Sequence, residues 1–251
     1  MGEMTRIEWT DHTFNPWIGC TKISEACHSC YAEKINKRTG NNNWGQGKSR
    51  RRTSDAYWDE PLRWDRKARK AGVFRRVFCA SMADVFDPEA PEECRPDLWH
   101  LIQETTNLLW LLLTKRPENI RQMLRKDLWG DPRIWLGVTA ENQKMADQRI
   151  PILLQTPAAK RFVSVEPMLG PVVLEATGRH LLGPASQQRG MNDGLDWVIC
   201  GPENGPGARP MDLEWPRSLL AQCRAAGVPI FMKTPKKYAL PSDLMVKEFP
   251  A

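Results

Sequence analysis

The chain has 251 residues, of which 41% are hydrophobic, and a formal net charge of +6. This composition excludes an intrinsically disordered chain and is sufficient for a globular core. The polar N-terminus, MGEMTRIEWTD, has no apolar run typical of a signal peptide, and the most apolar stretch, NLLWLLLT, is too short to cross a bilayer. We therefore expect a soluble cytoplasmic protein without a membrane segment.

The first motif in the chain is CTKISEACHSC, which places Cys20, Cys27 and Cys30 within eleven residues. The chain has seven cysteines, and an odd number in a reducing cytoplasm argues against a disulfide framework. Zinc would need a fourth ligand, for which His12 suits better than His28, which lies between two of the cysteines. A [4Fe–4S] cluster held by three thiolates instead leaves one iron open to a substrate or cofactor.

Basic residues crowd the next part of the chain. Residues 34–76 contain 14 Lys and Arg against 4 Asp and Glu, interleaved with Trp44, Tyr57, Trp58 and Trp64. Cations mixed with aromatic stacking platforms favour a nucleic acid or nucleotide as partner. The alternative is a solvated and partly mobile insertion.

Short apolar, β-prone runs recur at 14–20, 76–81, 108–114, 134–139, 161–165, 196–200 and 228–233. Each is continuously apolar, as in strands covered on both faces. Helix-like stretches lie between them, at 96–106, 117–126, 141–155 and 216–227. This alternation predicts an α/β fold, a full or partial (β/α) TIM-like barrel, with a doubly wound open sheet as the alternative. We expect a single domain over residues 1–251, with a basic, Trp-rich insertion at about 36–76.

Polar residues directly follow six of these apolar runs. In a β/α barrel this position, at the carboxyl ends of the strands, is where the active site is built. Each alone has a structural explanation, because Thr139 and Ser164 could be helix caps and Glu203 a surface loop residue. Arg209, in the loop GPGARP, suits a phosphate clamp or lid as well as a plain turn. Their coincidence favours an active site made of Ser81, Asp84, Lys115, Arg116, Thr139, Glu141, Asn142, Ser164, Glu166, Glu203 and Lys233.

The cysteine motif, with an aromatic residue directly after the third cysteine (CHSCY), resembles that of the radical S-adenosylmethionine (SAM) enzymes. Its spacing is six and then two residues, where three and then two is common in that superfamily. More closely, IEWTDHTFNPWIGCTKISEACHSCYAEK is similar to the start of a phage and bacterial family of radical-SAM-like proteins of unassigned activity. The resemblance continues over nearly the whole chain, through FCASMADVFDP, LLLTKRPENI, WLGVTAENQ, FVSVEPMLGP, WVICGPENGPGARPM and IFMK.

The resemblance implies a barrel of the radical SAM type and a role for each candidate residue. Cys20, Cys27 and Cys30 would each ligate one iron of a [4Fe–4S] cluster, whose fourth iron would chelate the amino and carboxylate groups of SAM. Ser81 and Asp84 would meet the amino group of SAM, and Lys115 or Arg116 its carboxylate. Thr139, Glu141 and Asn142 would bind the ribose of SAM. Ser164 and the catalytic candidate Glu166 would lie near the reacting centre. The substrate would be bound by Glu203, Arg209 and Lys233.

The activity implied by the resemblance is cleavage of SAM to methionine and a 5′-deoxyadenosyl radical, which abstracts hydrogen from a substrate. A reductase or other electron donor would supply the electron, in the host cytoplasm if a phage encodes the protein. The basic segment favours a nucleotide or nucleic-acid substrate, for example a modified thymidine rearranged during hypermodification of phage DNA. A base in duplex DNA would have to be flipped out. The alternatives are a radical SAM repair lyase for damaged DNA and a non-catalytic zinc or Fe–S nucleic-acid-binding protein, which would not need the polar strand ends.

Overall fold

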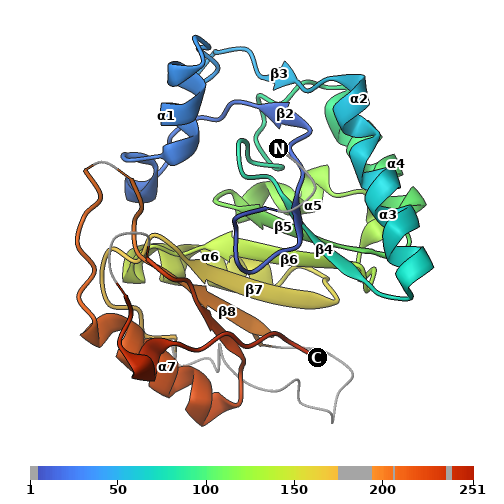
Figure 1. The fold of residues 1–251 in the computed structure, drawn as a ribbon. Coiled ribbons are helices and arrows are strands. Elements are labelled where there is room, and N and C mark those ends of the chain that lie inside the picture. Colours follow the sequence, from blue (N-terminus) through green and yellow to red (C-terminus); the bar gives the residue numbers. More distant parts are fainter. Residues whose placement is uncertain (1–4, 175–193, 206, 236–238) are drawn as a thin grey trace. The chain divides into compact units, whose positions relative to one another are not determined.

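The computed structural model describes residues 5–174, 194–205, 207–235 and 239–251 (Figure 1). The chain forms two compact units, and it passes between them more than once. The first unit contains residues 1–23 and 30–135, and the second contains residues 24–29 and 136–251. The boundary cuts the cysteine segment, so that Cys20 and Cys30 belong to the first unit and Cys27 to the second. The prediction of a single domain with an insertion stays a prediction.

Parallel strands form the centre of the first unit. Strand β4 pairs with β1 on one side and with β5 on the other. The three strands follow one another in the sheet in chain order, and β6 begins at the end of this unit. Their bounds are His12–Thr13 for β1, Arg75–Cys79 for β4, Leu108–Thr114 for β5 and Ile134–Thr139 for β6.

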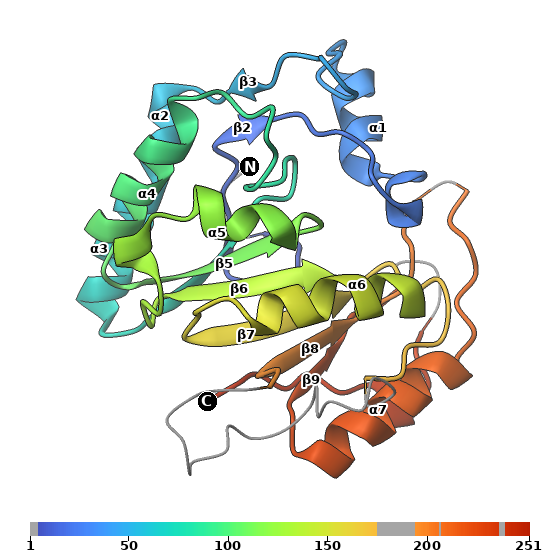
Figure 2. The ribbon, with the colours of Figure 1, turned by 180° about the vertical axis from the view of Figure 1, so that it is seen from behind.

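Helix α3 packs beside β4 and β5, and α3 and α4 lie side by side in both views (Figures 1 and 2). Helix α3 ends at Gly72, whose φ of 64° is the left-handed conformation that glycine adopts without steric cost. The bounds are Tyr31–Arg38 for α1, Asp55–Trp58 for α2, Glu60–Ala71 for α3, Cys94–Glu104 for α4 and Ile120–Met123 for α5.

The second unit continues the same alternation. Strands β7 and β8 are parallel, as are β8 and β9, and the strand order is β6, β7, β8, β9. Helix α6 covers the face of β6 and β7 that is turned to the viewer in Figure 2. Helix α7 ends at Gly227, as its sequence predicts. The bounds are Gln143–Leu154 for α6, Lys160–Val165 for β7, Trp197–Cys200 for β8, Glu214–Ala226 for α7 and Ile230–Met232 for β9.

The predicted strands agree well with the observed ones, with one exception. Strands β6, β8 and β9 are buried along their whole length, which explains their continuously apolar sequences. Within each unit the described strands follow chain order without reversal, as in a barrel and unlike a doubly wound sheet. The expected first strand at 14–20 is wrong: β1 is His12–Thr13, and β2 (Trp17–Ile18) pairs with β3 (Arg51–Arg52) in a separate small sheet.

The tryptophans of the basic segment belong to the core. Trp44, Trp58 and Trp64 are 8%, 8% and 1% exposed, and the Tyr57 hydroxyl donates to the Thr13 carbonyl at 3.0 Å. Their prediction as stacking platforms for bases is therefore wrong. Trp64 lies on the apolar side of the amphipathic helix α3, whose basic residues are exposed.

One basic residue of this segment is buried too. The Arg50 side chain is fully enclosed, pairs with Asp87 at 2.9 Å and with Glu89, and donates to Thr21 Oγ1 at 2.6 Å. These contacts anchor the basic segment beside Cys20. No helix within the described ranges is both long and apolar enough to cross a membrane.

Candidate active site

The backbone around Cys20 is fixed to two loops of the first unit. Gly19 has a φ of 126°, and a Cβ there would lie 2.5 Å from the Asn43 carbonyl oxygen, so only glycine fits. The Gly19 N–H donates to the Met82 carbonyl and the Gly45 N–H to the Cys20 carbonyl, each at 3.0 Å. The Gly-Cys pair thus holds the cysteine beside the loop that follows β4.

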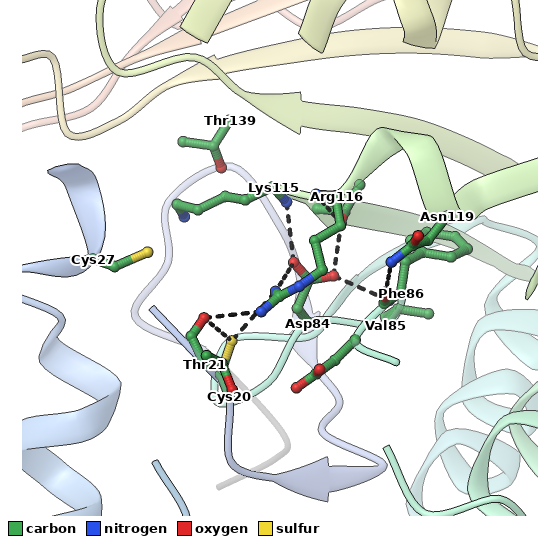
Figure 3. A network of polar contacts seen from close by, with 12 residues as sticks. Cys20, Thr21, Cys27, Asp84, Val85, Phe86, Lys115, Arg116, Asn119 and Thr139 are labelled. Atoms are coloured by element: carbon green, nitrogen blue, oxygen red, sulfur yellow. Dashed lines mark hydrogen bonds and ion pairs between the residues drawn. The ribbon is translucent and has the colours of Figure 1, made fainter. Parts of the chain in front are cut away.

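A buried carboxylate, Asp84, collects four hydrogen bonds after β4 (Figure 3). Its Oδ1 accepts from Thr114 Oγ1 at 2.6 Å and from the Phe86 N–H at 3.0 Å. Its Oδ2 accepts from the Lys115 N–H at 3.1 Å and from Arg116 Nη1 at 3.0 Å. Asp84 therefore orients the end of β5. Its binding of the SAM amino group stays a prediction.

Arg116 reaches from this carboxylate to the cysteine segment. Its side chain is 6% exposed, its Nη1 lies 3.7 Å from Cys20 Sγ, and its Nη2 donates to the Thr21 carbonyl at 2.9 Å. Burial lowers the pKa of Arg116, but the charges of Asp84, Cys20 and Asp87 together raise it above its ordinary value. The Arg116 guanidinium thus already has protein partners. Lys115 therefore stays the predicted residue for the SAM carboxylate.

The surroundings of Cys20 favour its protonated form in the free protein. Burial raises the pKa of the thiol to about 12, the Asp84 carboxylate adds to the rise, and Arg116 opposes it. A thiophilic metal that binds here must therefore displace the proton.

Cys30 is the N-cap residue of α1, and the next residue connects this helix to the strand-end loop. The Tyr31 hydroxyl donates to the Ser81 carbonyl at 3.0 Å. The Ser81 hydroxyl is 3.3 Å from the amide of Asn15, whose Oδ1 accepts from the Met82 N–H at 2.7 Å. Ser81 therefore lies in the loop that supports the cysteine helix, and its contact with SAM stays a prediction.

In the second unit, the short 3₁₀ turn that ends at Cys27 rests on a buried carboxylate. Glu141 accepts from the Ala26 N–H at 3.1 Å and pairs with Arg149 at 2.8 Å. Burial tends to raise the pKa of Glu141, but a hydrogen bond from Ser24 and the charge of Arg149 hold it below its ordinary value. Glu141, expected at the SAM ribose, thus holds the residue before Cys27.

Glu25, two residues before Cys27, is held from two sides. Asn142 Nδ2 donates to Glu25 Oε2 at 3.2 Å, and Asn142 Oδ1 caps α6. Arg209 Nη1 lies 3.3 Å from Glu25 Oε1, and its Nη2 donates to the Glu25 carbonyl at 3.2 Å. Glu203 in turn pairs with Arg209 at 2.6 Å. These three residues, predicted for ribose or substrate binding, support the turn that carries Cys27.

The remaining strand-end residues lie at the ends of β6, β7 and β9. Thr139 and Ser164 are buried, and the Ser164 carbonyl accepts from the Ala140 N–H at 2.9 Å. Glu166 forms an ion pair with Lys233, and both side chains are less than one-fifth exposed. The pair brings an acid and a base together after two strands. The catalytic role of Glu166, the substrate role of Lys233 and the SAM contacts of the other two stay predictions.

The donor set of the cysteine segment fits an iron–sulfur cluster. Cys20, Cys27 and Cys30 are half-buried free thiols, whereas the other four cysteines, Cys79, Cys94, Cys200 and Cys223, are buried. Burial raises the pKa of Cys223 to about 12. The three soft donors within reach of solvent thus all lie in one segment, as cluster ligation requires.

Within the described ranges the side chains form no ready-made site for any metal ion, zinc or iron alike, and His12 is poorly placed as a zinc ligand. Among the residues that the structure describes, no three His, Cys, Asp or Glu side chains are placed to hold a metal ion. His12, the expected fourth ligand, is buried in β1 with its ring stacked on Trp64 at 4.4 Å and an interplanar angle of 4°. This packing disfavours His12 as a ligand.

Residues 4–245 match the family model described as "Protein of unknown function (DUF5131)". The chain belongs to this family. No curated protein sequence matches it.

Solved structures of spore photoproduct lyase have a similar fold to this DUF5131 member. One, complexed with dinucleoside spore photoproduct, has 13% sequence identity and a TM-score of 0.57 over 93% of this chain and 79% of its own. Another, a double mutant with bound AdoMet and dinucleoside spore photoproduct, has 14% identity and a TM-score of 0.54 over 90% and 75%. The likeness confirms the predicted α/β fold as a partial (β/α) barrel.

We predict that Glu141→Gln lowers the free energy of unfolding by about 3 kcal/mol at pH 7, because Arg149 loses its buried partner. The lowered pKa of Glu141 means that its contribution is complete above the ordinary Glu pKa of about 4.3 and is lost as the pH falls through the folded-state value. Urea unfolding at several pH values should show a constant difference from pH 7 to about 5 that shrinks in more acidic buffer.

The matched control is Asp127→Asn, which removes an exposed carboxylate paired with Arg125 and should change stability little. Equal losses in both variants would contradict the role assigned to Glu141.

Proposed function

We propose that this chain is a radical SAM enzyme that acts on a nucleic-acid base, with the lyase-type reversal of base damage as its reaction. The observation that carries the proposal is the set of three half-buried thiols in one eleven-residue segment, held by buried charges after the strands of a partial barrel. The similar fold of a lyase whose structure contains AdoMet and dinucleoside spore photoproduct supports it.

The cysteines and Lys115 would bind the cluster and SAM. Cys20, Cys27 and Cys30 would hold a [4Fe–4S] cluster, which when bound with SAM supplies a 5′-deoxyadenosyl radical after receiving one electron. Lys115, next to the buried Arg116, would neutralise the SAM carboxylate. An external reductase or similar donor would provide the electron.

Glu166 and Lys233 are the best candidates to act on the substrate. They form an ion pair after β7 and β9, which places a carboxylate and an ammonium group at neighbouring strand ends. A Cβ at Gly201 would lie 3.0 Å from Lys233 Cβ, so glycine at this strand end leaves room for the pair.

Damage reversal replaces thymidine rearrangement as the preferred reaction. The sequence led us to expect first the rearrangement of a modified thymidine in phage DNA, with repair as the alternative. The structural neighbours are lyases with a dinucleoside photoproduct, and they support the alternative better. Thymidine rearrangement stays a prediction without support from the comparisons.

A basic helix face could hold the nucleic-acid backbone. Helix α3 exposes Arg63, Arg66, Lys67, Arg69 and Lys70, while its apolar side packs inward through Trp64 and Ala68. Phe74, just after this helix, is 59% exposed. Several cations on one face suit phosphate contacts that do not depend on sequence.

The reconstituted protein should cleave SAM. With iron, sulfide and dithionite under anaerobic conditions, we expect wild type to form 5′-deoxyadenosine and Cys27→Ala to remain at the background of the protein-free reaction, because a ligand of the cluster is lost. The readout is the amount of 5′-deoxyadenosine separated by chromatography, without substrate and with a dinucleotide photoproduct.

Cys223→Ala is the control, since it removes a buried thiol outside the cysteine segment and should retain activity. A wild-type protein that holds one zinc ion and leaves SAM intact would refute the enzyme and favour a nucleic-acid-binding protein.

Reversing two charges on α3 should weaken DNA binding. For Arg66→Glu with Lys70→Glu, we expect at least a tenfold loss of affinity for single-stranded oligothymidylate at low salt. The slope of log K against log salt should fall by about 1.4, or about 0.7 for each lost phosphate contact. Fluorescence anisotropy measures both quantities. An equal loss in Lys126→Glu with Arg224→Glu, which makes the same charge change at exposed sites elsewhere, would show that net charge alone is responsible.

A further inference from the structure

Arg116 occupies a position that neither SAM binding nor catalysis explains. Its guanidinium is buried at the end of β5 and contacts Asp84 Oδ2, the Thr21 carbonyl and the sulfur of Cys20 (Figure 3). Its backbone N–H donates to Thr114 Oγ1 at 2.8 Å, which fixes the start of the side chain as well. A cation is thus held against the sulfur of a proposed cluster ligand.

The contact singles out one of the three cysteines. The Cys20 sulfur lies 3.7 Å from Arg116 Nη1, within reach of an N–H···S hydrogen bond, whereas the Cys27 sulfur has the neutral hydroxyl of Ser24 at 3.9 Å. For the described residues, no contact joins the Cys30 sulfur to a cation. The three ligands therefore differ in their electrostatic surroundings.

The orientation of Arg116 is fixed before any cluster binds. The Asp84 carboxylate accepts a hydrogen bond from Arg116. It accepts three more, from the Thr114 hydroxyl and from the backbone N–H groups of Lys115 and Phe86. A carboxylate with four donors cannot turn away without leaving buried polar groups unpaired. The guanidinium is therefore aimed at Cys20 by the fold itself, and no cluster is needed to draw it there.

We propose that Arg116 is a positioning residue that raises the reduction potential of the cluster through a charge-assisted hydrogen bond to the Cys20 sulfur. This inference rests on the proposed function. Reduction adds one electron to the cluster without making or breaking a bond, and a cation beside a ligating sulfur stabilises the more negative form. Hydrogen bonds to the sulfurs are among the known determinants of cluster potentials.

Arg116→Gln should make reduction harder, because it removes the cation beside Cys20 while its side-chain amide can still donate to Asp84. We expect the equilibrium constant for reduction to fall about tenfold, which corresponds to about 59 mV for a one-electron couple. The measurement is a dithionite titration of the SAM-free reconstituted protein, followed by electron paramagnetic resonance. Arg116→Lys keeps the charge without the planar fork of donors and should fall between wild type and Arg116→Gln.

Arg133→Gln is the matched control, because Arg133 makes several hydrogen bonds to Asp131 and to backbone carbonyls but contacts no cysteine. Its cluster should keep the wild-type potential. An unchanged potential in Arg116→Gln would overturn the inference and leave the enzyme proposal intact. Failure of wild type to take up iron would instead refute the enzyme proposal.

A second measurement needs no variant. Wild type labelled with ¹⁵N-arginine and reduced should show a ¹⁵N coupling to the cluster in electron spin echo modulation, because the guanidinium donates to a ligating sulfur. Absence of this coupling in a protein that does contain the cluster would overturn the inference even if the variants do not fold.

Discussion

Buried charges hold the cysteine segment in place. This segment contains only a three-residue 3₁₀ turn, so its own backbone contributes little to its shape. The Asp84–Arg116 pair fixes Cys20 and Thr21, and the Glu141–Arg149 pair fixes Ala26. Cys20 and the turn that ends at Cys27 are therefore held by ion pairs between residues far away in the sequence.

Such pairs are costly to bury and are weak evidence for stability as such, because desolvation of both charges opposes their attraction. In this protein, their effect is to fix the orientation of the arginine side chains. Asp84 and Glu141 each collect several donors, so each partner arginine has one orientation. A rigid frame for the ligands is also what cluster chemistry needs, since the protein contributes binding, orientation and electrostatics while the cofactor carries out the reaction.

The sequence predicts the strands well but misses the buried partners that hold the cysteine segment, whose role as a cluster site stays a prediction. Apolar runs such as 108–114 and 134–139 agree with the observed strands because both faces are covered. The burial of Arg50, Arg116 and Arg149 could not be predicted this way, because a cation is assigned to the surface unless its carboxylate is known. Arg116 was expected at the active site, but its contact with Cys20, 96 residues away, was not. The tryptophans between basic residues were misassigned for a related reason: composition does not show which side chains of a segment face inward.

In the proposed function, three thiolates leave one iron of the cluster free to bind SAM. Electron–nuclear double resonance on the reduced, reconstituted protein, with SAM labelled with ¹⁵N at the amino group, detects this bond. We expect a ¹⁵N coupling to the cluster that unlabelled SAM does not give. A cluster whose spectrum shows no such coupling at saturating SAM would contradict it.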